Sequence, residues 1–292
     1  MILITGISSN TGTQLLRKLC DIVPSKEIVG IVRSEYYVNQ CEIQVEYGDL
    51  TDTAFLESLY SKYSFKEVIH VANIRFSNII MEISEKYNVQ RNVLIHTTGI
   101  FSKYQEYNSL YNQIENNIFN TKYIDTSYVI VRPSMIYGNE RDHNMHKLII
   151  FLKKSILFPL FGDGKSLMQP VHVEDLTDAI CEIFKRKDIL NEDFNITGGS
   201  VLEYQQIIKI ISDKLNKSTI IFKIPISLAL LGARLAKIIL RKSIITVEQI
   251  ERLQEDKVYS HEKAIQVFNY TPRSFEQGIE EEIEILKKKG II

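Results

Sequence analysis

The chain has 292 residues, of which 45% are hydrophobic and 24% charged, so it can bury a large globular core. Its formal net charge of -1, with lysine and glutamate intermixed, excludes the broad positive surface of a nucleic-acid-binding protein. The three cysteines lie far apart in the sequence and form no CxxC pair, which excludes a disulfide framework and gives no reason to expect a metal site.

The first apolar run begins at residue 2 without a preceding targeting pattern, and we expect a cytoplasmic protein. Apolar runs of strand length then alternate with amphipathic stretches, which is typical of βαβ units. We predict an α/β fold with a doubly wound parallel sheet. A dinucleotide-binding domain should cover residues 1–160 and a smaller α/β substrate lobe residues 161–292, with the last strand returning to the first domain. The predicted strands cover residues 1–5, 28–32, 43–47, 68–71, 92–96, 127–132 and 193–197.

A glycine-containing turn follows the first predicted strand, in the sequence ILITGISSNTGTQLL. Gly6 permits a tight turn, and Gly12 lets the next helix pack closely on the strand, so that N–H groups at the helix start face a pyrophosphate. The middle position of this GxxGxxG pattern is Ser9, whose Cβ narrows the approach although its hydroxyl can donate to a phosphate. The turn predicts an NAD or NADP site. Its predicted cofactor-binding residues are Thr5, Gly6, Ser9, Asn10, Thr11 and Gly12.

Arg33 and Ser34 end the second predicted strand, where an NAD enzyme often carries an acid that binds the ribose diol. A guanidinium and a hydroxyl suit a 2′-phosphate, so the sequence favours NADP over NAD. A solvated arginine beside Glu35 is the alternative. After the third strand, Asp49 and Leu50 could contact the adenine, with Asp49 accepting from its amino group, although Asp49 could equally be a turn residue.

The segment from Ile224 to Leu240 is strongly apolar, but Arg234 and Lys237 interrupt it below membrane-spanning length. We interpret it as a buried helix or as a helix at the interface of a homodimer. A helix lying in a membrane interface is the less favoured alternative, because the basic residues could face anionic headgroups.

Many motifs occur in one fixed order: TGxxxxxG, GDLTD, VIHVA, LIHTTG, VRPSMIYG, GDGKSLMQPVHVEDLTDAI and FNITGGS. In this order the chain resembles the extended short-chain dehydrogenase/reductase family, in particular the NAD-dependent epimerase/dehydratase group that acts on nucleotide sugars. The resemblance runs nearly end to end. It implies a Rossmann-like sheet for the cofactor and a C-terminal lobe for the sugar nucleotide.

The resemblance also implies a proton-transfer group, formed in that family by a Ser or Thr, a Tyr, and a Lys four residues after the Tyr. Thr98 and Tyr111 match the first two positions, whereas Glu115 stands in place of the Lys. An ammonium there lowers the pKa of the phenol and holds the ribose hydroxyls, while a carboxylate opposes formation of the tyrosinate. Lys103, Tyr104 or Tyr107 could instead contact the cofactor at this position. The alternative is that the tyrosines only form an aromatic face of the helix.

Two further groups complete the implied site. Val71 and Ala72, at the end of the fourth strand, would admit the ribose and nicotinamide side of the cofactor. Backbone groups after the sixth strand would line the nicotinamide pocket. In the loop that meets the substrate's phosphates or base, Gln169 stands where a basic residue is common. The residues predicted after the sixth strand are Pro133, Ser134 and Met135.

The expected function is therefore an NAD(P)-dependent oxidoreductase or epimerase of a nucleotide-linked sugar, for example a 4-keto sugar reductase. Tyr111 would exchange the hydroxyl proton and Thr98 would polarise the oxygen. A non-catalytic dinucleotide-binding or sensing protein is the alternative that the missing Lys favours. A reductase of a lipid or another small carbonyl compound is a further alternative, suggested by Gln169 and the apolar C-terminal segment.

Overall fold

The computed structural model describes residues 1–33, 41–103, 105–142, 144–230 and 251–292, with residues 105–109 described in their backbone alone. The chain forms two compact units. The first comprises Met1–Pro133, Val173–Ile196 and Ser260–Thr271. The second comprises Ser134–His172, Thr197–Tyr259 and Pro272–Ile292, so the boundary predicted at residue 160 lies inside the second unit.

A parallel sheet of seven strands forms the centre of the first unit. The strands are β1 (Ile2–Thr5), β2 (Ile28–Val32), β3 (Gln44–Tyr47), β4 (Glu67–His70), β5 (Arg91–Ile95), β6 (Ser127–Pro133) and β11 (Glu192–Ile196). Their order is β11-β6-β5-β4-β1-β2-β3. The predicted fold class and all seven predicted strands are confirmed, with no strand end displaced by more than one residue. Chain order reverses between β1 and β4, and ligands of such sheets bind at this reversal, beyond the carboxyl ends of the strands.

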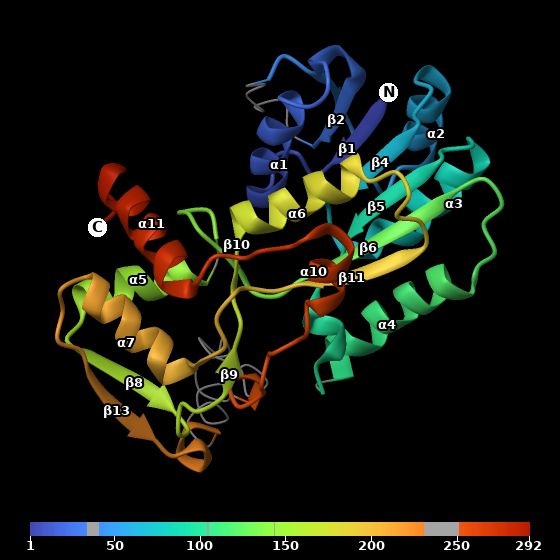
Figure 1. Cartoon of the computed structure of the whole chain (residues 1–292). Coiled ribbons are helices and arrows are strands. Elements are labelled where there is room, and N and C mark those ends of the chain that lie inside the picture. Colours follow the sequence, from blue (N-terminus) through green and yellow to red (C-terminus); the bar gives the residue numbers. More distant parts are fainter. Residues whose placement is uncertain (34–40, 104, 143, 231–250) are drawn as a thin grey trace. The chain divides into compact units, whose positions relative to one another are not determined.

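Helices cover both faces of this sheet, which explains why every residue of β1, β2, β4 and β5 is buried. Figure 1 shows α1 (Asn10–Cys20) beside α6 (Val173–Lys185) over one face. On the other face, Leu3, Val68 and Leu94 pack in one core with side chains of the remaining long helices. These helices are α2 (Thr53–Lys62), α3 (Ser77–Lys86) and α4 (Gln105–Asn120). Shorter helices of this unit are η1 (Ser25–Glu27), η2 (Ile74–Phe76), η3 (Thr98–Phe101) and α10 (Glu262–Phe268).

Helices and short sheets build the second unit around its own core. Its long helices within the described residues are α5 (Met145–Lys154), α7 (Tyr204–Lys214) and α11 (Phe275–Lys288). Its strands are β7 (Ile136–Tyr137), β8 (Leu157–Phe161), β9 (Leu167–Met168), β10 (Val171–His172), β12 (Leu202–Glu203) and β13 (Ile220–Ile224). They pair as three two-stranded sheets, β10 with β7 and β13 with β8 in parallel, and β12 with β9 antiparallel. Ile149, Ile207 and Ile279 are fully buried where the three helices meet.

The apolar segment predicted as a helix over Ile224–Leu240 is described only in its first part. β13 ends at Ile224 and a helix begins at Ile226, directly after Pro225, while residues 231–240 lie outside the described chain. Within the described residues, no helix combines the length and the apolar character needed to cross a bilayer.

Candidate functional site

The turn between β1 and α1 has room for glycine alone at both of its predicted glycine positions. Gly6 has a φ of +71°, and a Cβ there would lie 2.8 Å from the backbone nitrogen of Ala72. A Cβ on Gly12 would lie 2.1 Å from the carbonyl oxygen of Gly6. The start of α1 therefore packs directly on the turn, and the end of β4 approaches it from the other side.

Ser9 is the N-cap of α1, which gives this residue a definite structural role. Its hydroxyl oxygen accepts from the backbone N–H of Gly12 at 2.9 Å, and its own N–H donates to Gly6 at 2.9 Å. Asn10 and Thr11 follow as the first residues of the helix, whose N-terminal N–H groups lack acceptors within the helix. A tight glycine turn that ends in a helix N-terminus at the reversal of the sheet fits a dinucleotide pyrophosphate.

A buried histidine ties the turn to the end of β4. Thr5 Oγ1 lies 2.7 Å from Nδ1 of His70, and Nε2 of His70 lies 3.2 Å from the carbonyl oxygen of Asn73. Burial lowers the pKa of His70 to about 3, so the ring is neutral. Since a carbonyl can only accept, Nε2 carries the hydrogen and the Thr5 hydroxyl donates to Nδ1. The predicted cofactor residues Val71 and Ala72, both half-buried, follow directly, and Val71 N–H donates to Thr5 at 3.2 Å.

The ends of β2 and β3 carry the residues predicted to contact the adenosine. Asp49 Oδ1 accepts from both the backbone N–H and the hydroxyl of Thr51, each at 2.8 Å. These hydrogen bonds, with a smaller contribution from Arg33, hold the pKa of Asp49 below its usual value. Arg33 is exposed, whereas Leu50 is buried in the core. Ser34, predicted beside Arg33, lies outside the described residues.

Thr98 and Tyr111 lie on consecutive elements of the first unit. Thr98 begins η3 and is buried, and its hydroxyl donates to the carbonyl oxygen of Pro133 at 3.2 Å. This bond joins the chain after β5 to the last residue of β6. Tyr111 is a half-buried residue of α4 that packs against the core under this helix. Tyr104 and the side chain of Tyr107 lie outside the described residues.

Glu115 is buried in a network of charged and polar side chains. Oε1 lies 2.9 Å from Nδ1 of His96, and Oε2 lies 2.6 Å from Nη2 of Arg132. Arg132 also donates from Nε to the carboxylate and from Nη1 to Asp193. Burial alone would raise the pKa of Glu115, but hydrogen bonds from His96 and Arg132 hold it below its usual value. The carboxylate is therefore ionised and its charge is balanced inside the network.

His96 completes this network as a neutral ring. Burial lowers its pKa, against the opposing effect of Glu115. Because an ionised carboxylate only accepts, Nδ1 of His96 carries the hydrogen, and Nε2 accepts from Ser77 Oγ at 2.9 Å. Sequence reasoning identified Glu115 but missed both of its partners. The only sequence sign of them is a histidine and an arginine at the carboxyl ends of neighbouring strands.

Ser134, Met135 and Gln169 belong to the second unit. Ser134 Oγ donates to the carbonyl oxygen of Gln169 at 2.5 Å, and Met135 packs against the core of that unit. The buried side-chain amide of Gln169 donates to Gly198 O at 2.9 Å and accepts from Tyr259 N at 3.2 Å. Both the NH₂ group and the oxygen of this amide therefore form hydrogen bonds to backbone groups, which gives a structural reason for a glutamine at this position.

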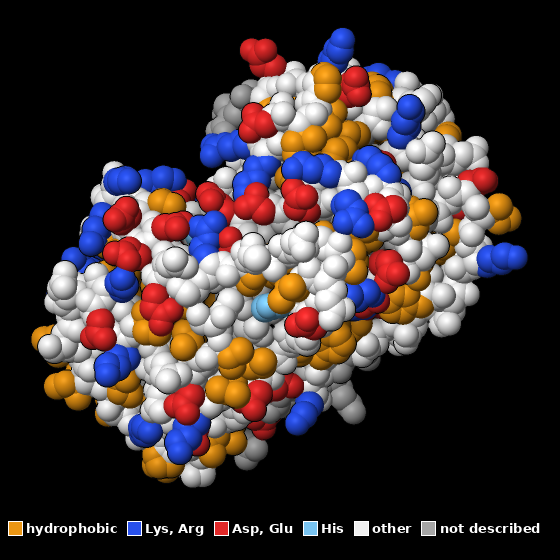
Figure 2. Space-filling model, in the orientation of Figure 1, with side chains coloured by type: hydrophobic (Ala, Val, Ile, Leu, Met, Phe, Trp, Pro, Cys, Tyr) orange, Lys and Arg blue, Asp and Glu red, His pale blue; other side chains and the backbone are white. Residues whose placement is uncertain are grey.

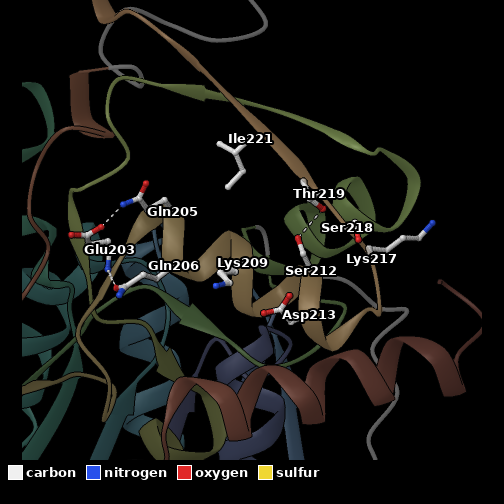
Figure 3. Close-up of a pocket in the computed structure, with 10 residues that line it drawn as sticks. All are labelled: Glu203, Gln205, Gln206, Lys209, Ser212, Asp213, Lys217, Ser218, Thr219 and Ile221. Carbon is white, nitrogen blue, oxygen red and sulfur yellow. Dashed lines mark hydrogen bonds between the residues drawn. The ribbon is translucent and has the colours of Figure 1, made fainter.

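A hollow of about 550 Å³ lies along α7 in the second unit, beside β13 and the turn before it (Figure 3). Its polar side chains bond partly to one another, as when Ser212 Oγ donates to Thr219 Oγ1 at 2.9 Å. None of the residues predicted from the sequence lines it. We assign it no part in the chemistry. Its lining residues are Glu203, Gln205, Gln206, Lys209, Ser212, Asp213, Lys217, Ser218, Thr219 and Ile221.

Comparison with known proteins agrees with this geometry. The model of the NAD dependent epimerase/dehydratase family matches residues 2–197. The structure of UDP-glucose 4-epimerase from Thermotoga maritima with UDP-glucose aligns with a TM-score of 0.77 at 16% identity, over 99% of both chains. The structure of UDP-glucuronic acid 4-epimerase from Bacillus cereus, in complex with UDP-glucuronic acid and NAD, aligns with a TM-score of 0.76 at 18% identity, also over 99% of both chains.

A third structure, UDP-glucose 4-epimerase from Thermus thermophilus in complex with NAD, aligns with a TM-score of 0.71 at 14% identity over 98% of both chains. At these identities the solved structures establish a shared fold. No curated protein matches the sequence.

Proposed function

This chain belongs to the NAD dependent epimerase/dehydratase family, and we propose that it is an enzyme that binds a nicotinamide dinucleotide and transforms a nucleotide-linked sugar. The observation that carries the proposal is the turn at Gly6 and Gly12, where neither residue has room for a Cβ. The UDP-sugar ligands of the structural neighbours support a nucleotide sugar as the substrate class.

The residues of the β1–α1 turn would hold the pyrophosphate. The first N–H groups of α1, at Asn10 and Thr11, present partial positive charge to it. Val71 and Ala72 would bound the ribose side. These residues would hold a nicotinamide dinucleotide, whose chemistry when bound would be hydride transfer to or from a sugar carbon.

We propose NADP as the preferred cofactor. Arg33 is exposed directly after β2, and its guanidinium can bind a 2′-phosphate through paired hydrogen bonds. NAD is the alternative, since it is the cofactor in the complexes from Bacillus cereus and Thermus thermophilus. Titration of the protein with NADPH and NADH, followed by nicotinamide fluorescence, separates the two. Arg33→Gln should weaken NADPH binding about tenfold and leave NADH binding unchanged; equal affinities that do not respond to the substitution would favour NAD.

For proton transfer, we propose that Tyr111 exchanges the proton of the sugar hydroxyl while Thr98 orients the oxygen. Thr98 already donates to Pro133, so it must redirect its hydroxyl hydrogen to polarise a substrate oxygen. The charge of Glu115 is balanced by Arg132, which reduces its repulsion of a developing tyrosinate.

The activity test is a screen of nucleotide 4-keto sugars for oxidation of NADPH or NADH, and of UDP-sugars for formation of an epimer, with Tyr111→Phe and Thr98→Val as variants. Epimer formation is measured directly because an epimerase regenerates its cofactor in each turnover. Tyr111→Phe should lower kcat by a factor of about 10² or more and leave cofactor binding intact. Turnover that survives Tyr111→Phe unchanged would remove Tyr111 from the mechanism.

A dinucleotide-binding protein without catalysis is the second candidate. The observation that favours it is the fixed position of Glu115, whose carboxylate is fully engaged by His96 and Arg132. Tight cofactor binding together with no turnover on any sugar nucleotide in the screen would select this function over the enzyme.

A further inference from the structure

The sheet formed by β8 and β13 has one face made only of apolar side chains. In the parallel register of the two strands, Leu157 lies beside Ile220, Pro159 beside Phe222, and Phe161 beside Ile224. Register partners point to the same side of a sheet, and so do alternate residues of one strand. The intervening Phe158 and Leu160 are buried in the core of the second unit, so the six paired residues face away from it.

Half of this outer face is open to solvent. Leu157 is 53% exposed, Ile220 59% and Phe222 44%, and the adjacent Ile156 is 62% exposed. Phe161 and Ile224, at the other end, pack against apolar side chains of the helix that follows β13. Contiguous exposed apolar surface of this kind marks an interaction site more often than scattered single residues do.

The two segments that contain these strands carry charge of one sign. No Asp or Glu occurs in residues 144–162 or 215–230, although the whole chain has 36 acidic and 35 basic residues. At the end of α5, Lys147 and Lys154 line one shallow hollow together with Phe151, which is also exposed. Figure 2 shows hydrophobic side chains interspersed with Lys or Arg, and with some Asp or Glu, at the lower left, where Figure 1 places β8 and β13. Lys223 pairs with Leu160 and therefore lies on the other side of the sheet. The remaining lysines of the two segments are Lys147, Lys153, Lys154 and Lys217.

We propose that this surface binds the interface of a membrane that contains anionic phospholipid. Apolar side chains would enter the boundary between headgroups and acyl chains, while the lysines meet lipid phosphates and carboxylates. This attachment needs no membrane-crossing helix. A second copy of the chain is a poorer occupant, because a two-fold contact would bring the same lysines of both copies together.

The sequence alone does not favour membrane association, because Arg234 and Lys237 interrupt its most apolar segment, Ile224 to Leu240. The face formed by β8 and β13 depends on a pairing between strands about sixty residues apart in the chain. Their register brings Leu157 and Ile220 together, which no local pattern indicates.

The test is co-sedimentation of the full chain with vesicles of phosphatidylcholine, with and without phosphatidylserine. We expect binding to the vesicles that contain phosphatidylserine, weakened by salt, and little binding to phosphatidylcholine alone. The double variant Leu157→Ser/Phe222→Ser should lower the partition coefficient at least tenfold. Lys153→Glu/Lys154→Glu should lower it about tenfold or more, since each lysine near an anionic surface adds about 1 kcal/mol.

Ile124→Ser is the matched control, because Ile124 is 82% exposed on the first unit. It should bind vesicles as the unsubstituted chain does. The proposal is overturned if the chain binds neither kind of vesicle, or if both double variants bind like the control. It is also overturned if Leu157→Ser/Phe222→Ser converts a dimer into monomers while vesicle binding stays absent, which would assign the surface to a second copy of the chain.

Discussion

Glu115 and Arg132 form a buried ion pair that joins α4 to the last strands of the sheet, with Oε2 of Glu115 2.6 Å from Nη2 of Arg132. Asp193 on β11 holds the other end of the guanidinium. One arginine therefore connects a helix and two strands, close to the carboxyl edge of the sheet where the cofactor is proposed to bind.

Removing the carboxylate should be costly, because it leaves Arg132 buried with a single anionic partner. Glu115→Gln is expected to lower the free energy of unfolding by about 3–5 kcal/mol, measured by urea denaturation. Glu57→Gln is the control, since it breaks an exposed ion pair with Lys86 and should have a much smaller effect. Equal effects of the two substitutions would contradict a buried, balanced network.

Installing the lysine that the family resemblance implies should not improve proton transfer by Tyr111. In Glu115→Lys an ammonium replaces the carboxylate beside Arg132, so two buried cations face each other without the anion between them. We expect this variant to be less stable than Glu115→Gln and to gain no turnover in the NADPH oxidation assay. The double variant Glu115→Lys/Arg132→Glu, which reverses the pair, should recover part of the stability lost by Glu115→Lys. Turnover gained by Glu115→Lys alone would show that this lysine is all the site lacks.

The features that could be predicted from the sequence are those that a short stretch of residues determines by itself, namely the strands and the glycine turn. The central strands were predictable because short runs of buried apolar residues form most of them, whereas β3 and β11 are partly exposed. The turn was predictable because the glycines at positions 6 and 12 are visible in the sequence. The partners of Glu115 were not, since His96 and Arg132 approach it from two different strands. Contacts between distant segments follow from the packing of the finished fold.

Glycine at position 12 should be indispensable for cofactor binding. A methyl group in Gly12→Ala would lie 2.1 Å from Gly6 O, so α1 must move away from the turn that holds the pyrophosphate. NADPH binding should weaken at least tenfold, and the free energy of unfolding should fall by about 1–3 kcal/mol. Gly290→Ala is a control with positive φ and no atom within 4 Å of the added methyl, and it should leave NADPH affinity unchanged.

Gln169 should act on the stability of the second unit through both ends of its amide. In Gln169→Leu the carbonyl of Gly198 and the N–H of Tyr259 lose their partner, and each unpaired buried group costs about 1–3 kcal/mol. The melting temperature should therefore fall clearly, whereas Gln113→Leu, at an exposed position of α4, should change it little. A Gln169→Arg variant should also be destabilised, because arginine has no acceptor for the Tyr259 N–H. An unchanged melting temperature for Gln169→Leu would show that these two bonds are dispensable.

Glu282 makes stability depend on pH in the direction opposite to most carboxyl groups. It is fully buried on α11, where one oxygen accepts from the N–H of Gly138 at 3.0 Å. Burial, followed by the neighbouring Asp142 and a weaker effect of Glu140, raises the pKa of Glu282 to about 10. The native chain thus keeps a proton that the unfolded chain releases near pH 4.3, the approximate pKa of a solvated Glu.

The stabilising effect of that proton is fully present below the unfolded pKa and declines as the pH rises toward the folded pKa of about 10. The slope for one proton is about 1.4 kcal/mol per pH unit. In Glu282→Gln an amide can donate toward Asp142 and still accept from Gly138, so the variant should retain stability at alkaline pH. Urea denaturation of both chains between about pH 6 and pH 9 measures the difference, which isolates Glu282 from the other titrating groups. Parallel stability curves would mean that Glu282 is ionised in the folded chain, and its burial against Asp142 would then require a compensating cation.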